Sequence, residues 1–152
     1  MPPTTKTPLS EDLRRLVGQP VAAIDTPALV VDLDAMRRNL GRMAEFARKH
    51  DIRWRPHAKM HKSSALARLQ LHAGAVGVCV QKTSEAEAMA AGGVLDIFIS
   101  NEVIAPGKLA RVADLAHELA AEAGQLAIAV DSAEGVRRLA NAMNARRRSG
   151  ES

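Results

Sequence analysis

At 152 residues, with 47% hydrophobic and 25% charged positions, the chain has the size and balance of one globular domain. Three of its 21 basic residues are the adjacent arginines 146–148, so the net charge of +4 does not indicate the basic face of a nucleic-acid-binding protein. An aromatic content of 2%, a single cysteine (Cys79) and the lack of an apolar run of roughly 18 residues lead us to expect no nucleic-acid partner, no disulfide framework, no membrane partner and a cytoplasmic location.

Segments typical of strands and helices alternate along the chain. A short first helix is predicted with Ser10 as its N-cap. Runs rich in valine, isoleucine and alanine, with one alternating run, predict five strands over 28–32, 52–60, 76–81, 96–100 and 126–131. Apolar residues at helical spacing predict helices over 35–49, over 84–91 with Thr83 or Ser84 as N-cap, after Pro106-Gly107, and from 131 or 132 to about 145.

Strands that alternate with helices predict an α/β fold with a parallel sheet, because parallel neighbours are joined by crossover connections. Two architectures remain open. A doubly wound sheet of five strands would be complete at this length, whereas the first five βα units of a (β/α)8 barrel would fall short of the roughly 200 residues that eight units need. We expect residues 1–24 to form an N-terminal arm, 25–145 the α/β domain and 146–152 a disordered tail.

The most informative segment is the alternating run that ends at His61. Its even positions are apolar, and its odd positions are basic or imidazole: Arg53, Arg55, His57, Lys59 and His61. Because side chains alternate along a strand, the odd positions share one face. In a sheet covered by helices this face is expected to line a cavity, while at an exposed edge strand it would simply lie in water.

Lys59 is the candidate reactive group of this segment. Crowding by cationic neighbours and partial burial disfavour its ammonium form and raise the share of free amine. A free amine attacks a carbonyl carbon and forms a Schiff base. The predicted position, near the carboxyl end of a strand, is where α/β enzymes place their reacting groups.

Four segments together resemble a known family. They are Thr-Pro-Ala-Leu-Val-Val-Asp at 26–32, Arg-Pro-His-Ala-Lys-Met-His-Lys at 55–62, Gln-Lys-Thr-Ser-Glu-Ala-Glu at 81–87 and Ser-Asn-Glu at 100–102. The sequence is similar, from about residue 20 to about 140, to pyridoxal-phosphate (PLP) enzymes with the alanine-racemase-like barrel, the D-threonine aldolase, D-serine dehydratase and β-hydroxyaspartate aldolase group. This resemblance implies an incomplete (β/α)8 barrel like the alanine racemase N-terminal domain.

The resemblance also implies site residues. Lys59 would hold PLP through a Schiff base, and His57 and His61 match motif positions that shape the site. Gln81 and Asn101 fall at the ends of successive predicted strands, where they would contact cofactor or substrate; structural hydrogen bonds at strand ends would explain them equally well. Met60 departs from the family pattern, in which a threonine commonly follows the lysine.

Members of this group are longer than this chain, which bears on activity. They complete the barrel, add a β-rich domain, take most phosphate contacts from later strands and bind a divalent metal near the C-terminus. We expect no metal ligands here, since His50, His72 and His117 lie on helical segments without partners at ligand spacing. We therefore expect a truncated or split copy with little activity alone, whose candidate partners are a second copy or a complementary C-terminal half.

The implied activity is PLP-dependent cleavage of D-configured β-hydroxy amino acids, of D-threonine or 3-hydroxyaspartate type, to glycine and an aldehyde. Dehydration by an enzyme of the same group, and a PLP-binding protein without catalysis, are the alternatives. A third alternative is a doubly wound binding module that does not bind PLP. It would need a glycine-rich loop after the first strand, and residues 32–37 contain no glycine.

Overall fold

The computed structural model describes residues 10–150, with side-chain detail to residue 147. The chain divides into two compact units, residues 1–36 and 37–152. Residues 151–152 of the expected tail lie outside the described residues. Among the described helices, none is both long and apolar enough to cross a membrane.

The first unit begins with the predicted capped helix. Ser10 Oγ accepts a hydrogen bond from the Leu13 backbone N–H at 3.4 Å, and α1 (Glu11–Arg15) follows it. A single 3-10 turn, η1 (Val21–Ala23), comes next. Both elements are short, and neither contains a buried residue.

The predicted strand over 28–32 is wrong. No backbone hydrogen bond pairs residues 28–31 with another segment in the described part of the chain. Asp32 instead starts α2 (Leu33–Lys49), because its Oδ1 accepts the Ala35 backbone N–H at 2.8 Å and satisfies a free donor of the first turn. A valine-rich run becomes a strand only where a neighbouring backbone lies within hydrogen-bonding reach.

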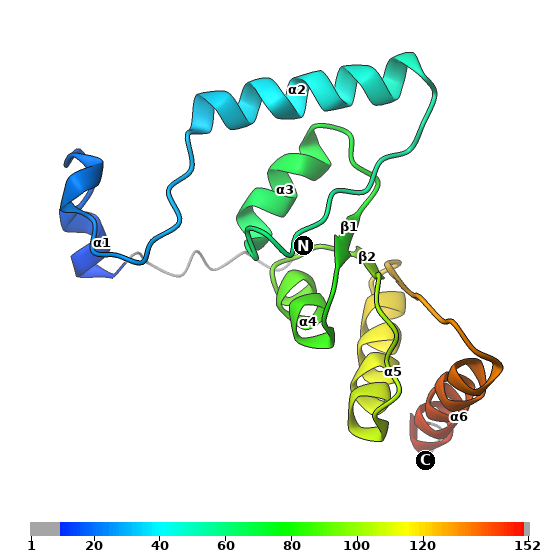
Figure 1. Ribbon diagram of the computed structural model, residues 1–152. Coiled ribbons are helices and arrows are strands. Elements are labelled where there is room, and N and C mark those ends of the chain that lie inside the picture. The colour runs from blue at the N-terminus through cyan, green and yellow to red at the C-terminus, as the bar shows by residue number, and fades with distance from the viewer. Residues whose placement is uncertain (1–9, 151–152) are drawn as a thin grey trace. The chain divides into compact units, whose positions relative to one another are not determined.

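The second unit contains a parallel three-stranded sheet, in the order β1 (Val78–Val80), β2 (Asp96–Ile99) and β3 (Gln125–Ile128). These are three of the five predicted strands. The helices of this unit after α2 are α3 (Ser64–His72), α4 (Thr83–Ala91), α5 (Pro106–Ala121) and α6 (Ala133–Gly150). In Figure 1 the green strands β1 and β2 lie beside α4 and α5.

The arrangement decides between the two architectures. Helices α3, α4, α5 and α6 each contact the next in the chain, so they form one consecutive layer, and the strand order is sequential without reversal. A doubly wound sheet would have helices on both faces and a reversal of strand order. The chain therefore has an α/β fold of the partial (β/α)8-barrel type.

The predicted strand over 52–60 forms only in part. Residues 54–58 run parallel to β1, with Trp54 O accepting from Val76 N at 3.1 Å, Pro56 O accepting from Cys79 N at 2.8 Å, and Ala58 N donating to Cys79 O at 2.7 Å. Pro56 has no N–H to donate, which interrupts the ladder. After Ala58 the chain turns, so Lys59 and Met60 lie in a turn and not in a strand.

The two faces of the sheet differ as the alternation predicts. Side chains on one face form the core with α4 and α5, and the fully buried members include Val78, Val80, Ile97, Ile99, Met89 and Val112. On the other face Arg55 forms an ion pair with Asp96, whose Oδ2 also accepts Gln125 Nε2 at 2.7 Å. Gly77 leaves room for this cluster, since a Cβ there would lie 2.5 Å from the Asp96 backbone oxygen. Residues 54–58, β2 and β3 thus each contribute a side chain to the polar face of the sheet.

The C-terminal boundary also differs from the expectation. Residues 146–150, expected to belong to a disordered tail, continue α6. Arginine favours helix, and Arg146 forms an ion pair with Asp114 of α5 at 2.5 Å, which ties this end of α6 to its neighbour.

Candidate functional site

Lys59 lies in the turn that follows the segment paired with β1. Its side chain is exposed, whereas the sequence pattern predicts partial burial. The physical reason is that strand pairing ends at residues 57–58, so Lys59 lies in a turn that leaves the sheet. Lys59 is therefore an accessible amine next to the carboxyl ends of the parallel strands.

His57 connects this turn to the ends of β1 and β2. The Lys59 backbone N–H donates to His57 Nδ1 at 3.2 Å. His57 Nε2 lies 3.3 Å from Ser100 Oγ, and that hydroxyl donates to the Val80 carbonyl oxygen at 3.1 Å. The structure thus brings His57 and Lys59 together, and adds Ser100 to them.

His61 lies in the turn just before α3. Its Nδ1 accepts the Ser63 backbone N–H at 3.1 Å, and Ser63 Oγ caps α3 by accepting the Leu66 N–H at 3.3 Å. His61 Nε2 and Gln70 Oε1 are buried and have no partner with hydrogen-bonding geometry among the described residues. The hydrogen bond of His61 is therefore with Ser63, the residue that caps the N-terminus of α3.

Gln81 and Asn101 lie just beyond the ends of β1 and β2, as expected. Gln81 is half-buried and Asn101 is exposed. Neither side chain makes a hydrogen bond to another residue within the part of the chain that the structure describes. Both amides remain available at the same edge of the sheet as Lys59.

Glu85 is a charged neighbour of the site that the sequence analysis missed. Its Oε2 accepts the backbone N–H groups of Gln81 at 2.9 Å and Lys82 at 3.3 Å, and its Oε1 lies 3.9 Å from Lys62 Nζ. The N-cap of α4 is accordingly Lys82, and the prediction of Thr83 or Ser84 is wrong. The available signal was the glutamate three residues after the cap, which is typical of a capping box.

Burial lowers the pKa of both imidazoles at this edge. For His57, desolvation is the main cause and the positive charge of Lys59 adds to it, while Glu85 opposes it. For His61, burial outweighs the opposing effects of Gln70 and the Ser63 backbone. The lowered pKa favours the neutral form of both rings.

This gives a prediction for acid stability. Because both pKa values are lower in the folded chain than the roughly 6.5 of an unfolded histidine, the unfolded state binds more protons below that pH. The urea midpoint should fall on acidification from about pH 7.5 to about pH 5.5. The double variant His57→Gln, His61→Gln should show a shallower fall than the wild type; equal slopes in the two proteins would contradict this account.

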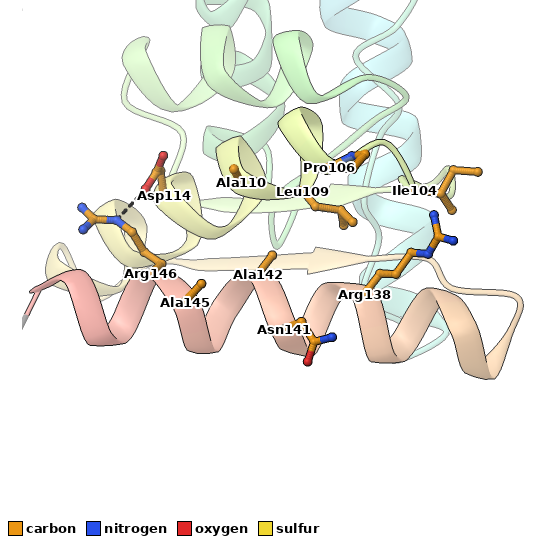
Figure 2. Close-up of a pocket in the computed structure, with 10 residues that line it drawn as sticks. All are labelled: Ile104, Pro106, Leu109, Ala110, Asp114, Arg138, Asn141, Ala142, Ala145 and Arg146. Carbon is orange, nitrogen blue, oxygen red and sulfur yellow. Dashed lines mark ion pairs between the residues drawn. The ribbon is translucent and has the colours of Figure 1, made fainter.

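An apolar hollow of the second unit lies elsewhere. Side chains of α5 and α6 border a groove of about 580 Å³, with Leu109, Ala110 and Ala142 on its walls and the Asp114–Arg146 ion pair at one end (Figure 2). None of the candidate site residues lines it. It belongs to the outer helical layer, whereas α/β enzymes carry their chemistry at the carboxyl ends of strands, so we place the candidate site at Lys59. Among residues 10–147, no three or more His, Cys, Asp or Glu side chains gather as metal ligands do.

Comparison with known sequences identifies relatives of this chain. A D-threonine aldolase of Arthrobacter sp. is 44% identical over 126 residues, which are 83% of this chain and 32% of that protein. A 3-hydroxy-D-aspartate aldolase of Paracoccus denitrificans (strain Pd 1222) is 48% identical over 68% of this chain and 27% of its own length. A D-threo-3-hydroxyaspartate dehydratase of Delftia sp. (strain HT23) is 41% identical over 60% of this chain and 24% of its own.

Comparison of structures agrees with the sequences. The D-threonine aldolase of Filomicrobium marinum superposes with a TM-score of 0.76 and 46% identity over 82% of this chain and 32% of that enzyme. The chain thus spans about a quarter to a third of the length of the relatives it matches. The model of the alanine racemase N-terminal domain matches residues 31–150. The chain therefore belongs to the alanine racemase N-terminal domain family.

Proposed function

We propose that this chain supplies the PLP-binding lysine and the adjoining part of the site of an enzyme that cleaves D-configured β-hydroxy amino acids to glycine and an aldehyde. One observation carries the proposal. Lys59 is an accessible amine at the carboxyl edge of a partial barrel, with its backbone held by His57, in a chain 44% identical to a D-threonine aldolase.

The residues present fit one end of PLP. Its aldehyde needs an accessible lysine side chain, and Lys59 offers one beside His57. Its phosphate needs backbone N–H groups or cations, but the start of α4 is occupied by the Glu85 carboxylate. The chain therefore fits the aldehyde end of PLP. We expect the PLP phosphate to be bound by groups that do not lie at this carboxyl edge of the sheet.

The roles of the chain's own residues follow from their positions. Lys59 Nζ would hold the cofactor covalently through its aldehyde group. His57, neutral and hydrogen-bonded at both ring nitrogens, would orient the turn that carries Lys59. The Gln81 and Asn101 amides would bind cofactor or substrate oxygens, and a role of His61 in shaping the site stays a prediction. When bound, PLP supplies an electron-accepting ring for the bond that breaks at the substrate Cα.

Similarity favours an aldolase over a dehydratase. The two aldolase sequences match this chain at 44% and 48% identity, against 41% over a shorter segment for the dehydratase. A small D-amino acid is therefore the proposed substrate. A homodimer or a complementary half as partner, a cytoplasmic location, and low activity of the 152-residue chain alone stay predictions.

A chimaera tests the proposed function. Residues 31–150 would replace the matching third of the Filomicrobium marinum enzyme, and the folded chimaera should convert D-threonine to glycine and acetaldehyde. The Lys59→Ala chimaera is the matched control and should form neither product. Release of 2-oxobutanoate and ammonia would assign the dehydratase reaction instead. A folded chimaera that forms neither set of products would contradict the proposal.

A further inference from the structure

The starting observation is the proton count at Ser100. A serine hydroxyl carries one hydrogen, and Ser100 Oγ donates it to the Val80 carbonyl oxygen at 3.1 Å. The same oxygen lies 3.3 Å from His57 Nε2. With that hydrogen donated to Val80 O, Ser100 Oγ can only accept from His57, and in this arrangement Nε2 carries a hydrogen.

The other ring nitrogen has the opposite role. A backbone N–H only donates, and that of Lys59 is directed at His57 Nδ1 at 3.2 Å. Nδ1 therefore holds a lone pair. With a hydrogen on Nε2 and none on Nδ1, His57 is a neutral imidazole in a single tautomer.

We propose that Ser100 is a positioning residue for Lys59. Its hydroxyl fixes His57 as the tautomer protonated on Nε2, and the Nδ1 of that ring then holds the backbone of Lys59. The relay runs from Val80 at the end of β1, through Ser100 just after β2, to the turn beyond residues 54–58. Ser100 does not touch the amine of Lys59.

The surroundings of His57 support the neutral ring. Burial and the charge of Lys59 both lower its pKa, and the facing Glu85, which opposes them, is occupied by two backbone N–H groups and by Lys62. A neutral ring can accept from the Lys59 N–H, whereas an imidazolium cannot. Loss of the Ser100 hydroxyl would free Nε2, so the proton could move to Nδ1 and break the bond to Lys59.

The consequence for function rests on the proposed role of Lys59 as the amine that takes PLP. A turn held in one conformation presents Nζ in one direction, while a released turn samples several. The relay therefore acts on how fast Lys59 reacts and leaves the fold intact. The fold survives because the Ser100 backbone N–H still donates to Val80 O at 2.9 Å without the side chain.

The test compares Ser100→Ala with Ser100→Thr, which keeps the hydroxyl, in the full 152-residue chain. Nitrogen-15 chemical shifts of the His57 ring separate the two tautomers without any cofactor. The wild type and Ser100→Thr should show a protonated Nε2 and a bare Nδ1, and Ser100→Ala should show a mixture. The rate at which PLP labels Lys59, trapped by borohydride, should fall about fivefold in Ser100→Ala, the effect of one lost hydrogen bond, and recover in Ser100→Thr.

The two measurements, the His57 ring shifts and the labelling of Lys59, separate a failure of the proposed function from a failure of the relay. If PLP does not label Lys59 in the wild type, the proposed function fails while the ring shifts still decide the relay. If Lys59 is labelled but Ser100→Ala matches the wild type in both tautomer and rate, the relay is overturned and the proposed function stands. A wild-type ring protonated on Nδ1 would also overturn it.

Discussion

Replacing Lys59 with alanine should abolish specific PLP attachment to the chain. The condensation needs an uncharged nitrogen nucleophile, and Lys59 is the accessible amine held beside His57 at the carboxyl edge. We expect the borohydride-trapped cofactor to fall at least about tenfold, to the background of exposed lysines. Absorbance of the reduced pyridoxyl group, measured per mole of chain, gives the value.

Two variants control for charge and for other amines. Lys59→Arg keeps the positive charge but not the nucleophile and should behave like Lys59→Ala. Lys82→Ala removes an exposed lysine just after β1 and should keep the wild-type value. Equal labelling of Lys59→Ala and the wild type would show that Lys59 is not the attachment site.

The Ile97→Ala substitution should have the largest effect on stability. Ile97 is fully buried in the central strand β2, in the core that Val78, Met89 and Val112 share. Truncating such a side chain costs about 2–5 kcal/mol, a large part of the 5–15 kcal/mol of a typical domain. Urea unfolding measures the loss. Unfolding should also separate Ser100 from His57, because Ser100 directly follows β2.

Val136→Ala is the matched control for this prediction. Val136 lies on α6 and is 50% exposed, so its truncation should change the free energy of unfolding by less than about 0.5 kcal/mol. If Ile97→Ala were as mild as Val136→Ala, β2 would not be the centre of the core.

The sequence analysis predicted the fold best where local pattern and long-range packing agree. The predicted strands over 76–81, 96–100 and 126–131 each overlap an observed strand, because their aliphatic side chains face a continuous core. The run at 28–32 has equal strand propensity but no paired neighbour among the described residues. Strand formation depends on that neighbour, and residue type does not reveal it.

The alternating segment shows the same limit within one motif. The period of two correctly placed Arg55 and His57 on the polar face. It did not reveal the turn after Ala58, where the chain leaves the sheet and carries Lys59 out to solvent. Pro56 was the available signal, since proline interrupts a strand ladder.

The sequence analysis predicted residues of the candidate site but not the hydrogen bonds between them. Lys59 and His57 stand two positions apart and were predicted together. The partner of His57 is Ser100, 43 residues later, and only the register of β1 against β2 brings the two close. The carboxylate of Glu85 was likewise visible in the motif, but its position across the start of α4 was not.

The most direct test of the central claim is peptide mapping of the PLP-treated, borohydride-reduced wild-type chain. The account predicts about one pyridoxyl group per chain, attached to Lys59, with Lys49, Lys62 and Lys82 close to background. Label spread evenly over these four lysines, or absent from Lys59, would contradict the assignment of Lys59 as the cofactor-binding residue.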